Sequence, residues 1–273
     1  MTLEDDLSLA LALADAADTI TQRRFGAVDL VIDTKPDLSP VSDADRAVEE
    51  SLRGRLERAR PEDAVWGEEF GQVGDSSRRW VIDPIDGTTP FLSGLADWCV
   101  SIAIAVEGEP VIGVIEAPRH RETWVAGQGR GATVNGTALR INPEADLTSG
   151  MFAFGGSLRC DPVETGGFVT RLMQSGCIAF HNGSGALMTA YVAGGRLVGY
   201  YDAHIKPWDC FAGLVMVSEA GGVFSFGDGD RLQNGGPLLV GAERPEGASE
   251  WANVPSATVS ATAEEIRSRP RRR

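Results

Sequence analysis

The most informative segment of the sequence is residues 80–89, which read WVIDPIDGTT. An apolar strand leads directly into Asp83, a proline stiffens the exit, and a second carboxylate follows at Asp86. Gly87 permits a tight turn, and two threonine hydroxyls come after it. Divalent cations such as Mg²⁺ prefer oxygen ligands, and N–H groups at a turn or helix start attract anions. The stretch therefore predicts a metal beside a phosphate, although Asp-Pro and Asp-Gly are also ordinary turn signals.

Three other acidic segments can bring carboxylates to the same place. Residues 65–71 read VWGEEFG, and either one of the two glutamates points at the site or both lie in an exposed loop. Asp209, in the sequence PWD, begins a helix, either as a simple N-cap or as a carboxylate held over a metal. Residues 42–45, SDAD, match a capping box, which competes with a ligand role for Asp45.

Apolar periodicity predicts an alternation of helices and strands. The expected helices are 3–25, 43–59, 168–174, 186–193 and 209–220. The expected strands are 64–66, 80–82, 98–106, 110–116, 122–126, 151–154, 177–180, 196–201, 223–226 and 237–240. The buried faces of the first two helices are predicted to be Leu7, Leu11, Ala14 and Ala17, then Ala44, Ala47, Val48, Leu52 and Leu56. A boundary near residue 145 divides the chain into halves 1–145 and 146–243, followed by a disordered tail, 244–273.

Composition excludes several classes of protein. The 273 residues include 25 Lys and Arg against 39 Asp and Glu, a formal net charge of −14, which argues against a partner that is a nucleic acid or an anionic membrane. Four cysteines without a C-x-x-C pair indicate reduced thiols rather than a zinc site. Neither a basic leader nor an apolar run of membrane length is found, so we expect a cytoplasmic protein.

Together, GEE, DPIDGTT, WD and a later EAGG, in this order and at these separations, resemble the inositol monophosphatase superfamily over residues 5–242. The first seventy residues also resemble the histidinol-phosphate phosphatase branch found in actinobacteria. The resemblance implies an α+β fold, an αβαβα layered sandwich. It also implies Mg²⁺-dependent hydrolysis of a small phosphate monoester with two or three Mg²⁺ per subunit, and a possible homodimer.

The resemblance assigns roles to individual residues. Two Mg²⁺ sites are implied, with the ligands Glu69, Asp83 and the Ile85 carbonyl for one, and Asp83, Asp86 and Asp209 for the other. Asp45 would lie near a weaker third site, and Thr88 with Asp45 or Glu69 would activate the attacking water. The implied substrate contacts are Gly87, Thr88, Thr89, Ser184, Asp202 and Lys206.

The identity of the substrate stays open between histidinol phosphate and an inositol or sugar-alcohol monophosphate. Pro90 follows DGTT where the family usually has a polar residue, so a donor used there to orient the substrate is missing. Two alternatives remain: a non-catalytic relative that acts as a binding or scaffold protein, and a phosphatase of 3'-phosphoadenosine-type nucleotides.

Overall fold

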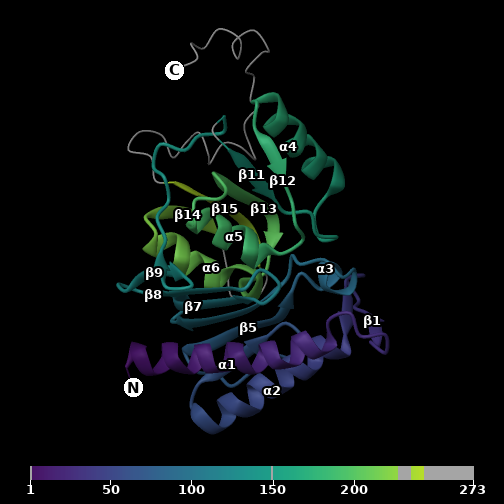
Figure 1. Ribbon diagram of the computed structural model, residues 1–273, viewed down its shortest axis with the longest axis vertical. Helices are drawn as coiled ribbons and strands as arrows, with labels where there is room; N and C mark the ends of the chain where they lie inside the picture. Colours follow the sequence, from purple (N-terminus) through teal and green to yellow (C-terminus); the bar gives the residue numbers. More distant parts are fainter. Residues whose placement is uncertain (1, 149, 227–234, 243–273) are drawn as a thin grey trace.

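Five layers of secondary structure make up the fold, as Figure 1 shows. The computed structural model describes residues 2–148, 150–226 and 235–242. In order, the layers are α1 (Leu3–Arg24) with α2 (Asp43–Ala59), an eight-stranded sheet, α5 (Gly185–Ala193) with α6 (Pro207–Glu219), a five-stranded sheet, and α4 (Pro162–Gln174). This arrangement confirms the expected α+β class and the αβαβα sandwich.

The two sheets divide the chain between them. From edge to edge, the larger sheet contains β10 (Thr137–Ala138), β9 (Gly131–Val134), β8 (Glu122–Gly127), β7 (Glu109–Ala117), β6 (Cys99–Val106), β5 (Arg78–Asp86), β3 (Ala64–Gly67) and β4 (Gly71–Val73). The smaller sheet contains β12 (Ile178–Phe180), β11 (Met151–Phe154), β13 (Gly199–Ile205), β15 (Gly236–Ala242) and β14 (Gly222–Phe226). Most neighbours are antiparallel, and the parallel pairs are β3–β5, β11–β12 and β11–β13.

Three short elements lie outside these layers and were not predicted. They are the hairpin of β1 (Ile32–Thr34) and β2 (Pro40–Ser42), and the single turn α3 (Thr88–Leu92), which packs against β2. The expected boundary near residue 145 falls between the two sheets, and the predicted division into halves stays a prediction. The expected tail lies outside the described residues.

Local signals fix the first two helices. In α1 the Thr2 hydroxyl accepts the N–H of Asp5 at 3.2 Å, and the Asp5 carboxylate accepts the N–H of Thr2 at 2.9 Å, which completes a capping box.

The buried faces of α1 and α2 differ from the predicted ones at three positions. Leu7 and Leu11 are half-buried and Ala47 is exposed, because the faces that meet the sheet are centred on Ala10, Leu13, Ala14 and Ala17 and on Val48, Leu52 and Leu56.

Several boundaries also move. The helix expected at 168–174 begins six residues earlier, because Asp161 caps it and Pro162 opens it. The strand expected at 196–201 lies instead at Gly199–Ile205. The strand expected at 80–82 continues to Asp86, since its pairing with β6 resumes after an irregularity.

The core consists of apolar layers on both sides of the larger sheet. Trp80 and Ile82 face α1 and α2, whereas Val81, between them, faces α5 and α6, as the alternation of a strand requires. The sheet approaches α6 closely at Gly113 of β7, where a Cβ atom would overlap the Ala212 carbonyl oxygen. The absence of a side chain at Gly113 thus sets the spacing between the second and third layers.

A pair of glycine substitutions tests this spacing. We expect Gly113→Ala to lower the free energy of unfolding by about 1–3 kcal/mol, because two backbone layers must separate. Gly54, inside α2, meets only an Arg58 side-chain atom at 3.8 Å, so Gly54→Ala should raise that free energy by roughly 0.5–1 kcal/mol. Urea unfolding of both variants measures the difference, and equal effects would contradict the close approach.

Candidate active site

A cavity of about 460 Å³ opens where the end of β5 meets α3 and the first turns of α5 and α6. Its wall includes the expected residues Asp83, Ile85, Asp86, Gly87, Thr88, Thr89, Asp202 and Asp209. Segments from both halves of the sequence therefore meet at one pocket.

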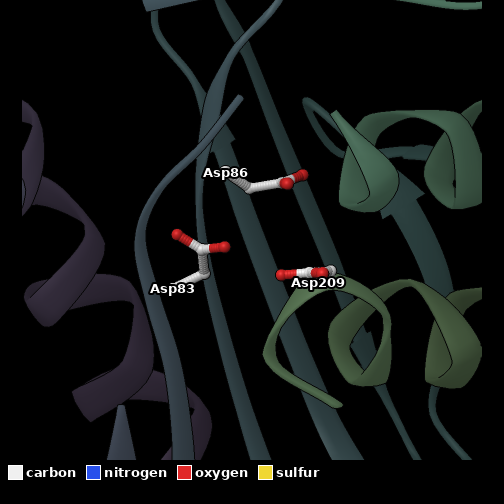
Figure 2. A group of neighbouring side chains, drawn as sticks. All are labelled: Asp83, Asp86 and Asp209. Atoms are coloured by element: carbon white, nitrogen blue, oxygen red, sulfur yellow. The ribbon is translucent and has the colours of Figure 1, made fainter. Parts of the chain in front are cut away.

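Three carboxylates lie together in this cavity (Figure 2). One oxygen of each of Asp83, Asp86 and Asp209 lies within 4.8 Å of the others, and Figure 2 shows the groups pointing into a common space. Burial, followed by repulsion from neighbouring carboxylates, raises the pKa of Asp83 and of Asp209 well above the usual value. Burial also raises the pKa of Asp86 to about 6. Three crowded carboxylates offer oxygen ligands alone, and such a set of ligands suits a divalent cation such as Mg²⁺.

A bulge in β5 brings two of these groups to the same side of the sheet. Side chains three positions apart on a regular strand point to opposite faces. Asp83 pairs with Ser101 and Asp86 with Cys99, so three steps on β5 match two on β6. This extra residue redirects Asp86 to the side of Asp83.

Backbone groups hold each carboxylate in place. Asp86 accepts the Ser184 hydroxyl and the N–H groups of Gly185 at 3.3 Å and Ala186 at 2.7 Å, all at the start of α5. Asp83 accepts the N–H of Ile85 at 3.0 Å. Asp209, in the first turn of α6, accepts the N–H of Lys206 at 3.3 Å.

The two glutamates of GEE occupy different places. Glu68 lies on the cavity wall, and its negative charge raises the pKa values of all three aspartates. Glu69, the expected ligand, is not among the lining residues, and burial raises its pKa to about 7. The Lys35 ammonium joins them, at 2.8 Å from Glu68 and 2.6 Å from Glu69. The structure thus places Glu68, rather than the expected Glu69, on the cavity wall, and the Glu68 N–H continues the β3–β5 pairing to the Ile82 carbonyl at 3.1 Å.

The expected pair of Thr88 and Asp45 is brought together. The Thr88 hydroxyl lies 3.2 Å from Asp45 Oδ1 and 3.1 Å from the Ile85 carbonyl oxygen. Asp45 is fully buried, and burial raises its pKa. It also accepts the Ser42 N–H at 2.8 Å, so the capping box and the contact with Thr88 use the same carboxylate.

Comparison with known proteins shows the family to which the chain belongs. The model of the inositol monophosphatase family matches residues 2–267. The chain belongs to this family. A histidinol-phosphatase of Mycobacterium tuberculosis is 41% identical over 249 residues, which cover 86% of this chain and 93% of that protein. A Nus factor SuhB of Xylella fastidiosa is 35% identical over 245 residues, 85% and 86% of the two chains. The solved Thermotoga maritima IMPase has a TM-score of 0.79 at 29% identity, covering 87% and 92%.

Membership in the inositol monophosphatase family identifies the chain as a phosphoric monoester hydrolase. The family depends on metal ions, and the buried acidic cluster supplies oxygen ligands that fit a cation. Within the described residues, none of the helices combines the length and the apolar content that a membrane span needs.

Two expected substrate contacts of the family occupy other positions. Ser184 is fully buried, caps α5 and donates to Asp86, so it holds a carboxylate rather than facing the cavity. Lys206 is not among the lining residues, and its ammonium lies 5.9 Å from the centre of the Trp208 ring.

Asp202 does line the cavity, where the Tyr200 hydroxyl at 2.9 Å and the His204 N–H at 2.8 Å fix its carboxylate. Pro90 lies in the first turn of α3, where a missing N–H breaks no helical bond.

Arg159 is a cavity residue that the sequence did not indicate. Arg159 lies on the loop between β11 and α4. Its guanidinium is 3.3 Å from the Asp209 carboxylate and 3.5 Å from the Asp37 carboxylate. A loop arginine carries no periodic or motif signal, and only the fold brings it to the carboxylates.

The raised pKa values make the stability of the metal-free protein depend on pH. A carboxyl group whose pKa is higher in the folded state contributes stability while protonated, and loses it as the pH rises through the folded value, about 6 for Asp86. In EDTA at about pH 8 we therefore expect Asp83→Asn to raise Tm, by roughly 2–4 °C for each kcal/mol of relieved repulsion. At about pH 5 the increase should be smaller.

Thermal unfolding in EDTA at both pH values provides the measurement. Asp75→Asn is the matched control, because Asp75 is exposed and does not line the cavity. A lower Tm for Asp83→Asn than for wild type at the higher pH would contradict the repulsion.

Proposed function

We propose that the protein hydrolyses a small phosphate monoester with Mg²⁺, and that histidinol phosphate is its principal substrate. The observation that carries the first part is the cluster of Asp83, Asp86 and Asp209 beside the start of α3. The similarity to histidinol-phosphatases over most of the chain supports the second part. The four cysteines, all free thiols, support a cytoplasmic location.

The donor set divides into two overlapping groups. Glu68, Asp83 and the Ile85 carbonyl would hold one Mg²⁺, with Glu68 replacing the expected Glu69. Asp83 is shared with the second group, which Asp86 and Asp209 complete. Asp45 would lie near a third, weaker site. When bound, Mg²⁺ supplies charge neutralisation for phosphoryl oxygens and makes a water molecule more acidic.

The residues around this cluster position the phosphate and the water. The N–H groups of Gly87 and Thr88 start α3, where they have no helical acceptor, and we assign them to the phosphate oxygens. The Thr88 hydroxyl donates a hydrogen bond to Asp45, so as the attacking water gives a proton to the Thr88 oxygen, the original hydroxyl proton would move to the Asp45 carboxylate, which ends the step protonated. Gly87 is needed because its φ is +94° and a Cβ would lie 2.7 Å from the Asp97 carbonyl oxygen.

The far wall of the cavity favours an amino alcohol. Asp202 is buried, and its oxygens accept hydrogen bonds from the Tyr200 hydroxyl, the His204 N–H and the Cys160 thiol. An ammonium group of the substrate would give this carboxylate a charged partner, which the hydroxyls of inositol cannot. Thr89, exposed at the rim, would contact the same part of the substrate.

A panel of phosphate monoesters tests the substrate. We expect kcat/KM for histidinol phosphate to exceed that for inositol 1-phosphate, and Asp202→Asn to reduce this preference about 10- to 100-fold, the effect of losing one charge-assisted hydrogen bond. Asp161→Asn is the control, because Asp161 caps α4 outside the cavity wall. Preference of the wild type for inositol 1-phosphate would reject histidinol phosphate.

A second experiment tests the ligand assignment. We expect Glu68→Gln to lower kcat at least about 100-fold, because several kcal/mol of electrostatic stabilisation depend on a bound metal. Glu69→Gln should have a smaller effect, since Glu69 does not line the cavity. Phosphate release is measured with Mg²⁺ and with EDTA. Activity that survives EDTA, or a greater loss in Glu69→Gln, would contradict the assignment.

A further inference from the structure

Glu49 is a fully buried carboxylate to which the proposed mechanism gives no part. It lies in the middle of α2, one turn after Asp45, and its side chain has no exposed surface. A buried charge is costly unless it is paired and hydrogen-bonded. The hydrogen-bond partners of the Glu49 carboxylate therefore indicate its role.

The Glu49 carboxylate binds the turn that connects β3 to β4. Its Oε2 accepts the N–H of Glu69 at 2.7 Å, and its Oε1 accepts the N–H of Phe70 at 3.2 Å. Oε1 also accepts Arg53 Nε at 2.7 Å, and Arg53 donates to the Gly71 carbonyl oxygen. One helix thus holds three consecutive backbone groups of the turn.

Glu68 lies inside this held segment. On its N-terminal side, Gly67 packs so closely on Glu49 that a Cβ would lie 2.0 Å from Oε1. On its C-terminal side, the N–H of Glu69 is bound, and the N–H of Glu68 itself is held by Ile82 at 3.1 Å. The backbone that directs the Glu68 side chain into the cavity is therefore fixed on both sides.

We propose that Glu49 is a positioning residue that sets the affinity of the metal site at Glu68. This inference rests on the proposed function, in which Glu68 is a ligand. Groups that orient a metal ligand commonly change metal affinity by about 10- to 100-fold when they are lost. The carboxylate is required because three N–H donors converge on its two oxygens. Glutamine has one acceptor oxygen and would direct its own NH₂ group at a donor.

Metal binding to the full-length metal-free protein tests the proposal. Mg²⁺ is titrated while Tm is followed, Mn²⁺ binding is measured by calorimetry, and phosphatase activity is recorded against Mg²⁺ concentration. We expect Glu49→Gln to raise the half-saturating Mg²⁺ and the Mn²⁺ Kd about 10- to 100-fold, with kcat at saturating Mg²⁺ close to wild type. Glu50→Gln, the same change at the neighbouring exposed position, should leave all three measurements unchanged.

A purely structural role would lower Tm without moving metal affinity, and wild-type half-saturation in Glu49→Gln overturns the inference. If Glu49→Gln does not fold, Gly67→Ala provides the measurement, because its methyl group overlaps the carboxylate and displaces the same turn. Wild-type metal affinity in that variant also overturns the inference.

Glu68→Gln, measured in parallel, separates the two proposals. A loss of metal affinity in Glu68→Gln but not in Glu49→Gln removes this inference and leaves the proposed function intact. Unchanged metal affinity in Glu68→Gln removes the ligand assignment on which both depend.

Discussion

Repulsion among buried carboxylates at the end of β5 is the constraint around which the rest of the structure is arranged. Asp83, Asp86 and Asp209 offer oxygens within 4.8 Å of one another, and Glu68 adds a fourth negative charge. Such a group destabilises the metal-free protein when its members are ionised, and the side chains stay close together only because the surrounding packing prevents them from moving apart. The apolar layers on both sides of the larger sheet provide that rigidity, because β5 has Trp80 and Ile82 buried on one face.

Directed N–H groups, rather than side-chain cations, hold most of these carboxylates. The first turn of α5 donates to Asp86, and the first turn of α6 holds Asp209. Helix N-termini favour negative charge, so each helix stabilises a carboxylate without filling the space between them. The same device recurs at Glu49, which two N–H groups of the turn after β3 contact. Backbone N–H groups thus fix the orientation of these carboxylates at the cavity.

Signals confined to one segment could be read from the sequence, and those that depend on strand pairing could not. The capping boxes at Thr2 and Ser42 are local, and both helices begin where they predict. The choice between Glu68 and Glu69 depends on how far β3 pairs with β5, which no local pattern records. The role of Ser184 could not be read from the sequence for a similar reason, because its hydroxyl donates to Asp86, which lies ninety-eight positions earlier in the chain.

In the proposed function, segments from the earlier and later parts of the sequence bind different parts of the substrate. The phosphate side is built from β5, α3 and α2, whose positions are set by sheet pairing and by bonds such as Thr88 to Asp45. In the same proposal, β13 supplies Asp202 to the alcohol side, and the loop after β11 brings Arg159 to within 3.3 Å of Asp209. A family with this arrangement can therefore vary its alcohol while it keeps one way of cleaving the phosphate ester.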